Sequence, residues 1–121
     1  MTATYQDAHL LACVDAIKAL GNRIGLYVGA TRVGTVYADT TWGSSAKVTE
    51  DGFTWGKVTG SAATITVPAS TVANGTVIDR YGILSGSTLL RTELLPVSLT
   101  INDGSQAFSV DVTPILRYRG L

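Results

Sequence analysis

The side chains of this sequence with the greatest chemical potential are its single histidine and its single cysteine, His9 and Cys13. They lie four residues apart in a segment with helical periodicity, so they share one face of the predicted helix. Both side chains can bind zinc, but a closed zinc site takes four ligands. The sequence has no CxxC motif and no second histidine. We therefore predict no metal site, and we interpret His9 as a helix-surface residue and Cys13 as a small buried thiol.

Carboxylates are the second group with chemical potential, because two acids about 5 to 9 Å apart across a sugar can hydrolyse a glycosidic bond. Glu50 and Asp51 lie in a predicted loop, and Asp79 and Asp103 lie at turns or strand ends. The dipeptides Asp51-Gly52 and Asp103-Gly104 are typical of tight turns and need no catalytic explanation. We predict no catalytic residues, and we rank a hydrolase last among the candidate functions.

Motifs for nucleotides and calcium are missing from the sequence. It contains neither GxxxxGK(S/T) nor GxGxxG, the glycine-rich patterns that cradle phosphate groups. The tripeptide at 102–104, Asn-Asp-Gly, offers too few oxygen ligands for a calcium loop. We therefore predict no cofactor.

Aromatic side chains recur in the predicted strands. An exposed tryptophan pair on a flat sheet is typical of carbohydrate-binding modules, but large aromatic residues also dominate the cores of small domains. Trp42 and Phe108 lie in alternating strand patterns, which favours the core for both. Trp55 lies in a run flanked by Gly52 and Gly56, where the sequence is equally compatible with a core and an interface position.

The C-terminal segment combines two arginines with an aromatic residue, in the order Arg117, Tyr118, Arg119. Arginine and tyrosine are enriched among the residues that carry the binding energy of protein interfaces. We predict an interface formed by Trp55, Arg117, Tyr118 and Arg119. The alternative for the C-terminal segment is a solvated tail, the usual fate of a terminus.

An N-terminal amphipathic helix is predicted over residues 4–21. A capping box of Thr4 and Asp7 would open it, and a left-handed residue at Gly21-Asn22 would end it. Helical spacing predicts that its apolar side comprises Leu10, Cys13, Val14, Ile17 and Leu20. We expect this side to pack on the sheet or on a neighbouring subunit.

The rest of the chain predicts short strands. Apolar residues alternate with Thr and Ser, as at 64–67, which places one face of a strand in a core. We predict strands at 23–28, 35–42, from Phe53 onward, and at 64–67, 76–84 and 88–95, with a loop at 43–50 and a break at Pro96. The strongest predicted hairpin pairs 97–102 with 106–112 through Asp103-Gly104. Residues 115–119 form a last short strand or arm.

This spacing of strands and turns predicts a mainly β fold, an antiparallel β-sandwich or flattened barrel with one N-terminal helix. At 121 residues the chain is expected to form a single domain. Within it we assign residues 4–21 to the helix, 23–114 to the sandwich and 115–121 to the C-terminal strand or arm.

The charge balance limits the partners. Charged residues make up 15% of the chain, against about 25% in typical domains, and nine basic side chains balance nine acidic ones. A neutral, charge-poor surface promotes association, so we expect a homo-oligomer. A nucleic-acid partner is not expected, because it would need a basic face. No stretch approaches the roughly 18 uninterrupted apolar residues of a membrane helix, so no membrane partner is expected either.

Six short motifs follow in order along nearly the whole chain. They are Ala-Ile-Lys-Ala-Leu-Gly at 16–21, Arg-Ile-Gly-Leu-Tyr at 23–27, Thr-Thr-Trp-Gly at 40–43, Thr-Ile-Thr-Val-Pro-Ala at 64–69, Val-Ile-Asp-Arg-Tyr-Gly-Ile-Leu-Ser-Gly at 77–86, and Gly-Ser-Gln-Ala-Phe-Ser-Val at 104–110. Their order resembles a family of small virion proteins of tailed bacteriophages, especially those with actinobacterial hosts. Members are labelled tail-fibre or minor tail proteins, and similar sandwich subunits decorate phage heads.

The resemblance implies no catalytic residues. Many members of the family carry a segment of the type Leu-His-Thr-Ala-Asp-Pro-Gly after the first strand. This chain has Leu-Tyr-Val-Gly-Ala-Thr at 26–31 instead. Any role of that loop in the family therefore does not carry over to this chain.

Together, the residues and the resemblance predict a non-enzymatic structural virion protein of a tailed double-stranded DNA bacteriophage. We expect an accessory subunit that decorates or stabilises the capsid, as a decoration or minor capsid protein. The alternative is a minor tail or tail-fibre protein, and a carbohydrate-binding module for host recognition ranks third. The implied partners are the major capsid protein or tail proteins, and further copies of the chain, with a trimer favoured. The expected location is the virion, after synthesis in the host bacterial cytoplasm.

Overall fold

Strands dominate the computed structural model, which describes residues 6–119. Their order along the chain is α1 (Asp7–Lys18), β1 (Arg23–Val28), β2 (Thr31–Arg32), β3 (Ala38–Asp39), β4 (Ala46–Glu50), β5 (Phe53–Thr59), β6 (Ala63–Val67), β7 (Val77–Ser85), β8 (Thr88–Thr100), β9 (Phe108–Val112) and β10 (Ile115–Tyr118). The strand pairs are antiparallel. The predicted mainly β class with one helix near the N-terminus is therefore confirmed.

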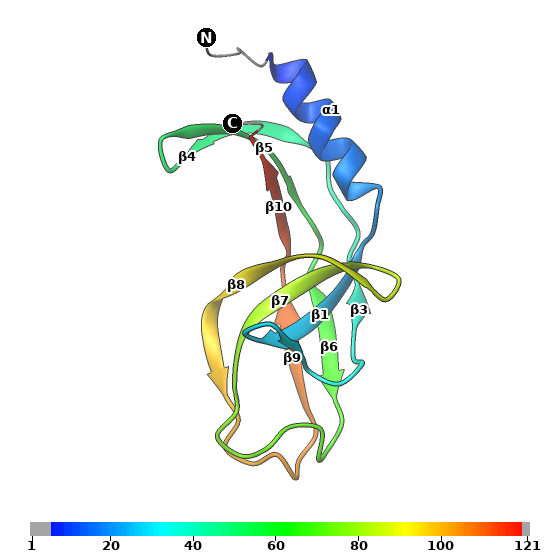
Figure 1. Ribbon diagram of the computed structural model, residues 1–121, viewed down its shortest axis with the longest axis vertical. Coiled ribbons are helices and arrows are strands. Elements are labelled where there is room, and N and C mark those ends of the chain that lie inside the picture. Colours follow the sequence, from blue (N-terminus) through cyan, green and yellow to red (C-terminus); the bar gives the residue numbers. More distant parts are fainter. Residues whose placement is uncertain (1–5, 120–121) are drawn as a thin grey trace.

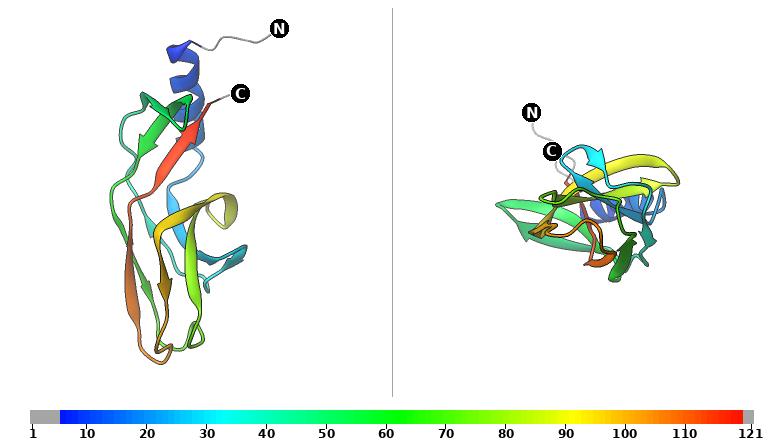
Figure 2. Two further views of the ribbon diagram at one scale, coloured as in Figure 1. Left: turned by 90° about the vertical axis from the view of Figure 1, so that its left-hand side faces the viewer. Right: turned by 90° about the horizontal axis from the view of Figure 1, so that it is seen from below.

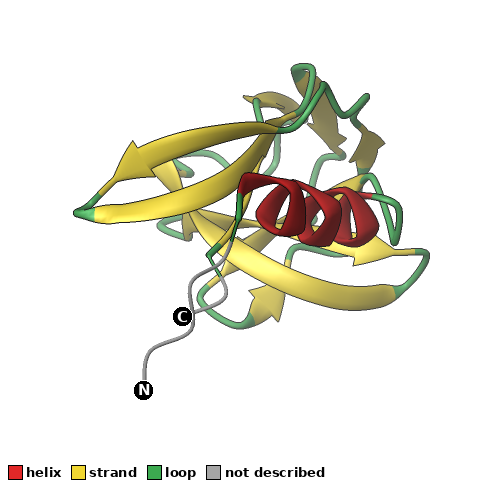
Figure 3. Cartoon of the chain, turned by 90° about the horizontal axis from the view of Figure 1, so that it is seen from above, coloured by secondary structure: helices red, strands yellow, loops and turns green. Residues whose placement is uncertain are grey.

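The elements form two regions that follow each other along the long axis of the molecule (Figure 1). In the sandwich region, a sheet with the order β2-β1-β7-β8, in which β3 also pairs with β1, lies with the two-stranded sheet β6-β9. In the helix region, α1 packs on the three-stranded sheet β10-β5-β4. Figure 3 looks down on the helix region, with α1 in front of the strands.

A two-stranded ribbon connects the regions. β5 runs on into β6, and β9 runs on into β10, so the β5–β10 and β6–β9 pairs succeed each other along the molecule (Figure 2). At the junction, the amide of Gly60 donates to the carbonyl oxygen of Pro114 at 2.9 Å. A Cβ on Gly60 would lie 2.3 Å from Thr40 Oγ1, so the close packing of this junction requires glycine.

One apolar core extends through both regions. Its buried residues include Val14, Val58 and Leu116 in the helix region, and Ile24 and Ile65 in the sandwich region. The alternation predicted at 64–67 is confirmed, because β6 alternates between buried and exposed residues along its length. The two regions therefore share their apolar contacts, although their sheets are separate.

The predicted helix boundaries need correction. The helix begins after Gln6, whose side chain makes no capping bond, and Thr4 of the predicted capping box lies outside the described residues. The helix ends at Lys18, with Ala19 in a right-handed conformation. Gly21 does not end it, and its backbone has no positive φ. A Cβ on Gly21 would lie 2.2 Å from the carbonyl oxygen of Leu84, so glycine serves a close approach of chain segments there.

The predicted apolar side of the helix is only partly confirmed. Leu10 and Val14 are buried, and Ile17 packs against the core. Leu20 lies beyond the end of the helix and is 56% exposed. Because the helix ends one turn earlier than predicted, helical spacing no longer directs Leu20 toward the sheet.

Two predictions on strands between residues 35 and 50 were wrong. The predicted strand at 35–42 is reduced to β3, and the hydroxyl of Thr40 is buried and donates to the carbonyl oxygen of Ser61. The predicted loop at 43–50 contains β4, which pairs with β5 across the predicted Asp51-Gly52 turn. Both turn residues have positive φ, 53° and 77°, which suits a tight hairpin. This turn imposes β4 on a segment with little apolar alternation.

The strongest predicted hairpin was also wrong. β9 pairs with β6, with Val110 opposite Ile65, whereas residues 97–100 belong to β8, where Leu99 and Thr100 pair with β7. The segment that connects β8 to β9 is bound by the loop before β7, because Asn74 Oδ1 accepts the amide hydrogen of Gly104 at 2.6 Å. The prediction failed because a turn signal does not choose the strand partner.

Pro96 does not interrupt the chain as predicted. β8 continues through it, and the pairing with β7 shifts between Ile78 and Arg80. The missing amide hydrogen of proline therefore falls where the pairing is irregular. The predicted last strand is confirmed as β10, which pairs with β5.

Candidate functional site

The face of the helix region opposite α1 carries the candidate site. Gly56 and Leu116 face the helix: a Cβ on Gly56 would lie 2.8 Å from the carbonyl oxygen of Leu10, and Leu116 is buried in the shared core. Side chains alternate between the faces of a strand. Phe53 and Trp55 on β5, and Arg117 on β10, therefore lie on the opposite face.

Two arginines stack on two aromatic rings on this face. The guanidinium carbon of Arg119 lies 3.7 Å from the ring centroid of Phe53, and that of Arg117 lies 4.3 Å from the ring centroid of Trp55. The two rings meet edge to face, with centroids 6.4 Å apart. We call Phe53, Trp55, Arg117 and Arg119 the arginine–aromatic cluster. The register that pairs Arg117 with Lys57 makes Trp55 a diagonal neighbour of Arg117, within reach of its long side chain.

Carboxylates of the β4–β5 hairpin hold one of the two arginines in place. Arg117 Nη1 lies 3.1 Å from Glu50 Oε1 and 3.4 Å from Asp51 Oδ2, and Lys57 Nζ donates to Glu50 Oε2 at 2.8 Å. Trp55 Nε1 donates to the backbone carbonyl oxygen of Glu50 at 2.9 Å. Within residues 6–119, by contrast, no carboxylate forms an ion pair with Arg119.

The electrostatics keep Glu50 ionised. The hydrogen bond from Lys57 is the main cause that lowers the pKa of Glu50, the hydrogen bond from Arg117 adds to it, and burial acts in the opposite direction. A general acid in glycoside hydrolysis needs a raised pKa. The shift at Glu50 therefore suits a structural anion better than a proton donor.

The predicted interface residues separate into two groups. Trp55, Arg117 and Arg119 come together in the cluster. Tyr118 lies on the α1 side of β10 and packs against the core. Phe53, which is 48% exposed, completes the cluster but was not among the predicted interface residues. Its position two residues before Trp55 in a strand was the available signal, because such residues share a face.

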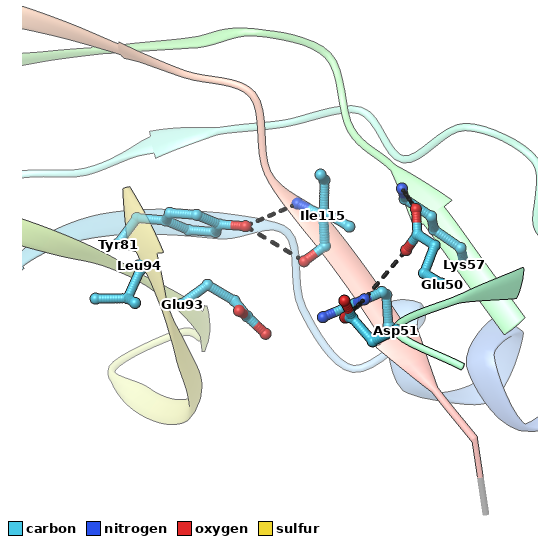
Figure 4. Close-up of a pocket in the computed structure, with 8 residues that line it drawn as sticks. Glu50, Asp51, Lys57, Tyr81, Glu93, Leu94 and Ile115 are labelled. Carbon is cyan, nitrogen blue, oxygen red and sulfur yellow. Dashed lines mark hydrogen bonds and ion pairs between the residues drawn. The ribbon is translucent and has the colours of Figure 1, made fainter. Parts of the chain in front are cut away.

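Beside the cluster, the edge of β10 that does not pair with β5 is bound by side chains of the sandwich region. The hydroxyl of Tyr81 accepts the amide hydrogen of Ile115 at 2.9 Å and donates to the carbonyl oxygen of the same residue at 3.4 Å (Figure 4). Arg91 Nη1 donates to the carbonyl oxygen of Arg117 at 3.0 Å. These two side chains of the sandwich region bind edge groups that a neighbouring strand would otherwise bind.

A groove accompanies this edge in two parts that meet at Arg117. One part, of about 570 Å³, lies between the carboxylates of the β4–β5 hairpin and the residues Tyr81, Glu93 and Leu94 (Figure 4). The other, of about 490 Å³, is largely apolar and includes Leu20 and Leu90 in its lining. Burial raises the pKa of the Tyr81 hydroxyl, which favours its protonated, hydrogen-bonding form.

The remaining sequence candidates lie elsewhere. Cys13 Sγ and His9 Nε2 are 3.7 Å apart, so the two do share a helix face. Cys13 is partly rather than fully buried. In the part of the chain that the structure describes, no three His, Cys, Asp or Glu side chains gather as a metal ion would require, and none of the helical structure there is long and apolar enough to span a bilayer.

The tryptophans do not form a common sugar platform. Trp42 packs partly buried against the core, where its Nε1 donates to the carbonyl oxygen of Gly21 at 2.9 Å. Trp55 has its ring beneath Arg117. Phe108 also packs against the core. Trp42 and Phe108, the two aromatic residues predicted to lie in the core, are therefore only partly buried. Neither family models, nor curated proteins, nor solved structures match this chain.

Proposed function

We propose that this protein is a non-enzymatic structural subunit of a tailed double-stranded DNA bacteriophage particle, which docks on another virion protein through the arginine–aromatic cluster. The favoured position is the capsid, as a decoration or minor capsid protein. The order of motifs along the sequence supports the class of protein. The cluster supports docking as its mode of action.

The partly exposed stack of arginines on aromatic rings, in which Phe53 is 48% exposed, is the observation that carries this proposal. Arginine, tryptophan and other aromatic residues are enriched at the centres of protein interfaces. Arg117 is already held by Glu50 and by the ring of Trp55. Docking on a partner therefore costs little further side-chain conformational entropy at Arg117. Arg119 is positioned over Phe53, and within residues 6–119 no carboxylate pairs with it, so a carboxylate of the partner fits this position.

The partner surface that fits this site combines a carboxylate with an apolar patch. The carboxylate would pair with Arg119, and the apolar patch would cover the exposed part of Phe53. A repeating capsid lattice offers such a surface many times over. Weak single contacts then become durable if the copies are linked to one another.

The copy number in purified particles tests the proposed position. A capsid subunit should be present at hundreds of copies per virion, measured by quantitative mass spectrometry against the major capsid protein. A few copies located at the tail by immunogold labelling would support the minor tail or tail-fibre alternative. Absence from washed virions would refute both.

Rebinding tests the proposed surface. Particles lacking the protein are mixed with purified wild type or variants and then sedimented. Arg119→Glu should abolish co-sedimentation, because it places a carboxylate where the partner is expected to offer one. Arg80→Glu is the matched control, since Arg80 lies on β7 and its Nη1 contacts Thr92 on β8 rather than the cluster. Equal binding by both variants would exclude the cluster as the docking surface.

A further inference from the structure

The edge strand β8 is long and apolar, yet none of its thirteen residues is fully buried. Its neighbour β7 buries five of nine. Leu94 is 62% exposed and Val97 is 73% exposed. Among the described residues β8 pairs with β7 alone, so its other edge presents open backbone groups. Natural proteins usually protect such an edge with charges, prolines or bulges. β8 carries Arg91, Glu93 and Pro96, and its pairing with β7 is regular over residues 91–94, with register shifts on either side of that stretch.

The sequence of β8 is complementary to itself. Residues 89–95 read Leu-Leu-Arg-Thr-Glu-Leu-Leu, with Thr92 at the centre. In an antiparallel pair centred on Thr92, Arg91 would lie opposite Glu93 of the partner subunit. Leu90 would lie opposite Leu94 of the partner subunit. Opposite charges and paired apolar residues at directly facing positions both stabilise a sheet.

We propose that β8 pairs with β8 of a second copy of this chain, antiparallel and about a two-fold axis at Thr92. Such an interface is self-complementary, because each contact occurs twice. It would join the two five-stranded sheets across their open edges.

The charges select this register over its neighbours. Shifting the axis by one residue to Arg91 would place Arg91 opposite Arg91 of the partner subunit. Shifting it to Glu93 would place Glu93 opposite Glu93 of the partner subunit. Like charges at facing positions destabilise a sheet, so only the axis at Thr92 brings each charge to its opposite.

The ion pair of β8 is already formed within one chain. Arg91 Nη2 contacts Glu93 Oε1, and the side chains are about one-third exposed. Pairing of two copies would therefore bring together two neutral ion pairs, and each arginine would gain a second carboxylate. Partial burial strengthens such contacts relative to a fully exposed pair. Burial also lowers the pKa of Arg91, in keeping with its partly desolvated surroundings.

The apolar part of the groove lies along the same edge. It is lined by Leu90 and by Leu20, which is 56% exposed after the end of the helix. In the proposed pair, Leu94 of the partner subunit lies opposite Leu90, next to this part of the groove. The turn end of the β7–β8 hairpin also projects from the body of the molecule (Figures 1 and 2).

Charge reversal in two separate chains tests this pairing. Wild type should be a dimer in analytical ultracentrifugation of the full chain. Glu93→Arg alone and Arg91→Glu alone should each raise the dimer dissociation constant about tenfold or more, because facing charges become alike. An equimolar mixture of the two variants should form a heterodimer at wild-type concentrations, since each arginine then faces a glutamate. Lys47→Glu serves as a matched control with wild-type association, because Lys47 lies on β4 and pairs with Asp7, away from β8.

A cross-link tests the axis itself. In a Cys13→Ser background, Thr92→Cys places one thiol opposite its copy, at the strand-to-strand distance that a disulfide spans. Oxidation should give a covalent dimer, whereas Ser98→Cys should remain uncross-linked. A monomeric wild type would overturn the inference. So would the absence of rescue in the mixture, or a trimer in which Thr92→Cys does not cross-link. None of these measurements needs a virion, so they leave the docking proposal to its own test.

Discussion

The outer face of the helix region and the open edge of the sandwich region differ in how far they are ordered before a partner arrives. On the helix region, Arg117 is held by Glu50 and lies over Trp55. On the sandwich region, β8 exposes leucines along an edge with unpaired backbone groups. A preordered polar surface selects its partner at a low entropic cost. An exposed apolar strand gains free energy from almost any burial, so its specificity must come from register and charge.

The seam between the two regions shows the same contrast at a smaller scale. Tyr81 and Arg91 of the sandwich region bind the backbone edge of β10. The edge of β10 is therefore covered by side chains of the same chain, whereas the edge of β8 is not. Among the described residues, one sheet edge is closed by side chains of the same chain, and the other is the edge that we propose pairs with a second copy.

The largest expected effect separates a buried leucine from an exposed one. Leu116→Asp places a carboxylate in the shared core, where the native side chain is 2% exposed, and should cost several kcal/mol of unfolding free energy. Leu94→Asp makes the same chemical change on the open edge and should stay within about 0.5 kcal/mol. Thermal and urea unfolding of dilute, monomeric samples measure both. Equal destabilisation would show that β8 is not a free edge.

A hydroxyl deletion at the seam should have the next largest effect. Tyr81→Phe leaves the amide hydrogen of Ile115 without its acceptor, which should cost about 1–3 kcal/mol. Hydrogen exchange at the amide of Ile115 should accelerate in the same variant. Tyr37→Phe is the control, because Tyr37 is largely exposed and its ring lies beneath Arg23. An unchanged urea midpoint for Tyr81→Phe would mean that other contacts close the edge of β10.

Removing one arginine of the cluster should have a smaller effect on stability. Arg119→Ala removes the cation above Phe53 and should cost about 0.5–1 kcal/mol, as expected for an exposed cation–π contact. Trp55 fluorescence should change with it, since Arg119 also lies 5.4 Å from the centroid of that ring. Arg119→Lys should recover part of the loss. A loss of several kcal/mol would mean that the cluster belongs to the core.

The smallest effect is a pH dependence that distinguishes the two regions. Because the folded protein lowers the pKa of Glu50, the unfolded chain binds a proton at Glu50 at a higher pH than the folded protein does. The free energy of unfolding therefore falls as the pH drops from about 4.5 through the folded pKa. Glu50→Gln should flatten this part of the profile of urea midpoint against pH. Salt should flatten it too, because the partners of Glu50 are the cations Lys57 and Arg117.

Asp103 provides the comparison in the sandwich region. Hydrogen bonds from the side chain and backbone of Ser105 lower the pKa of Asp103. The ionised carboxylate therefore also stabilises the fold at a pH above the usual pKa of aspartate, and this stabilisation is lost as the pH falls through the folded pKa. Its partners are neutral, and salt should affect the Asp103→Asn difference less than the Glu50→Gln difference. The reverse order of salt sensitivity would contradict the assignment of these partners.

Local signals predicted the local features of this chain. β1 has the predicted bounds, and the predicted turn at Asp51-Gly52 has a glycine with positive φ. Such signals depend on a few neighbouring residues and so survive in the folded chain. The segment 46–50 lacked such a signal, and its strand exists only because β5 returns beside it.

The candidate site was predictable in part for the same reason. Trp55, Arg117 and Arg119 could be named from residue type, because arginine and large aromatics favour interfaces. Their stacking could not, since it depends on the register of β10 against β5. That register also places Tyr118 on the opposite face, a separation that a list of neighbouring residues does not reveal.

By itself, the sequence determined the composition of the surface, the turns and the alternation within each strand, because these depend on residue type and short-range geometry. It also contains the self-complementary segment at 89–95. The tertiary structure alone decided that β9 pairs with β6 and that β8 keeps an open edge. Strand partners lie far apart in sequence and are chosen by the packing of the shared core, which no local pattern encodes.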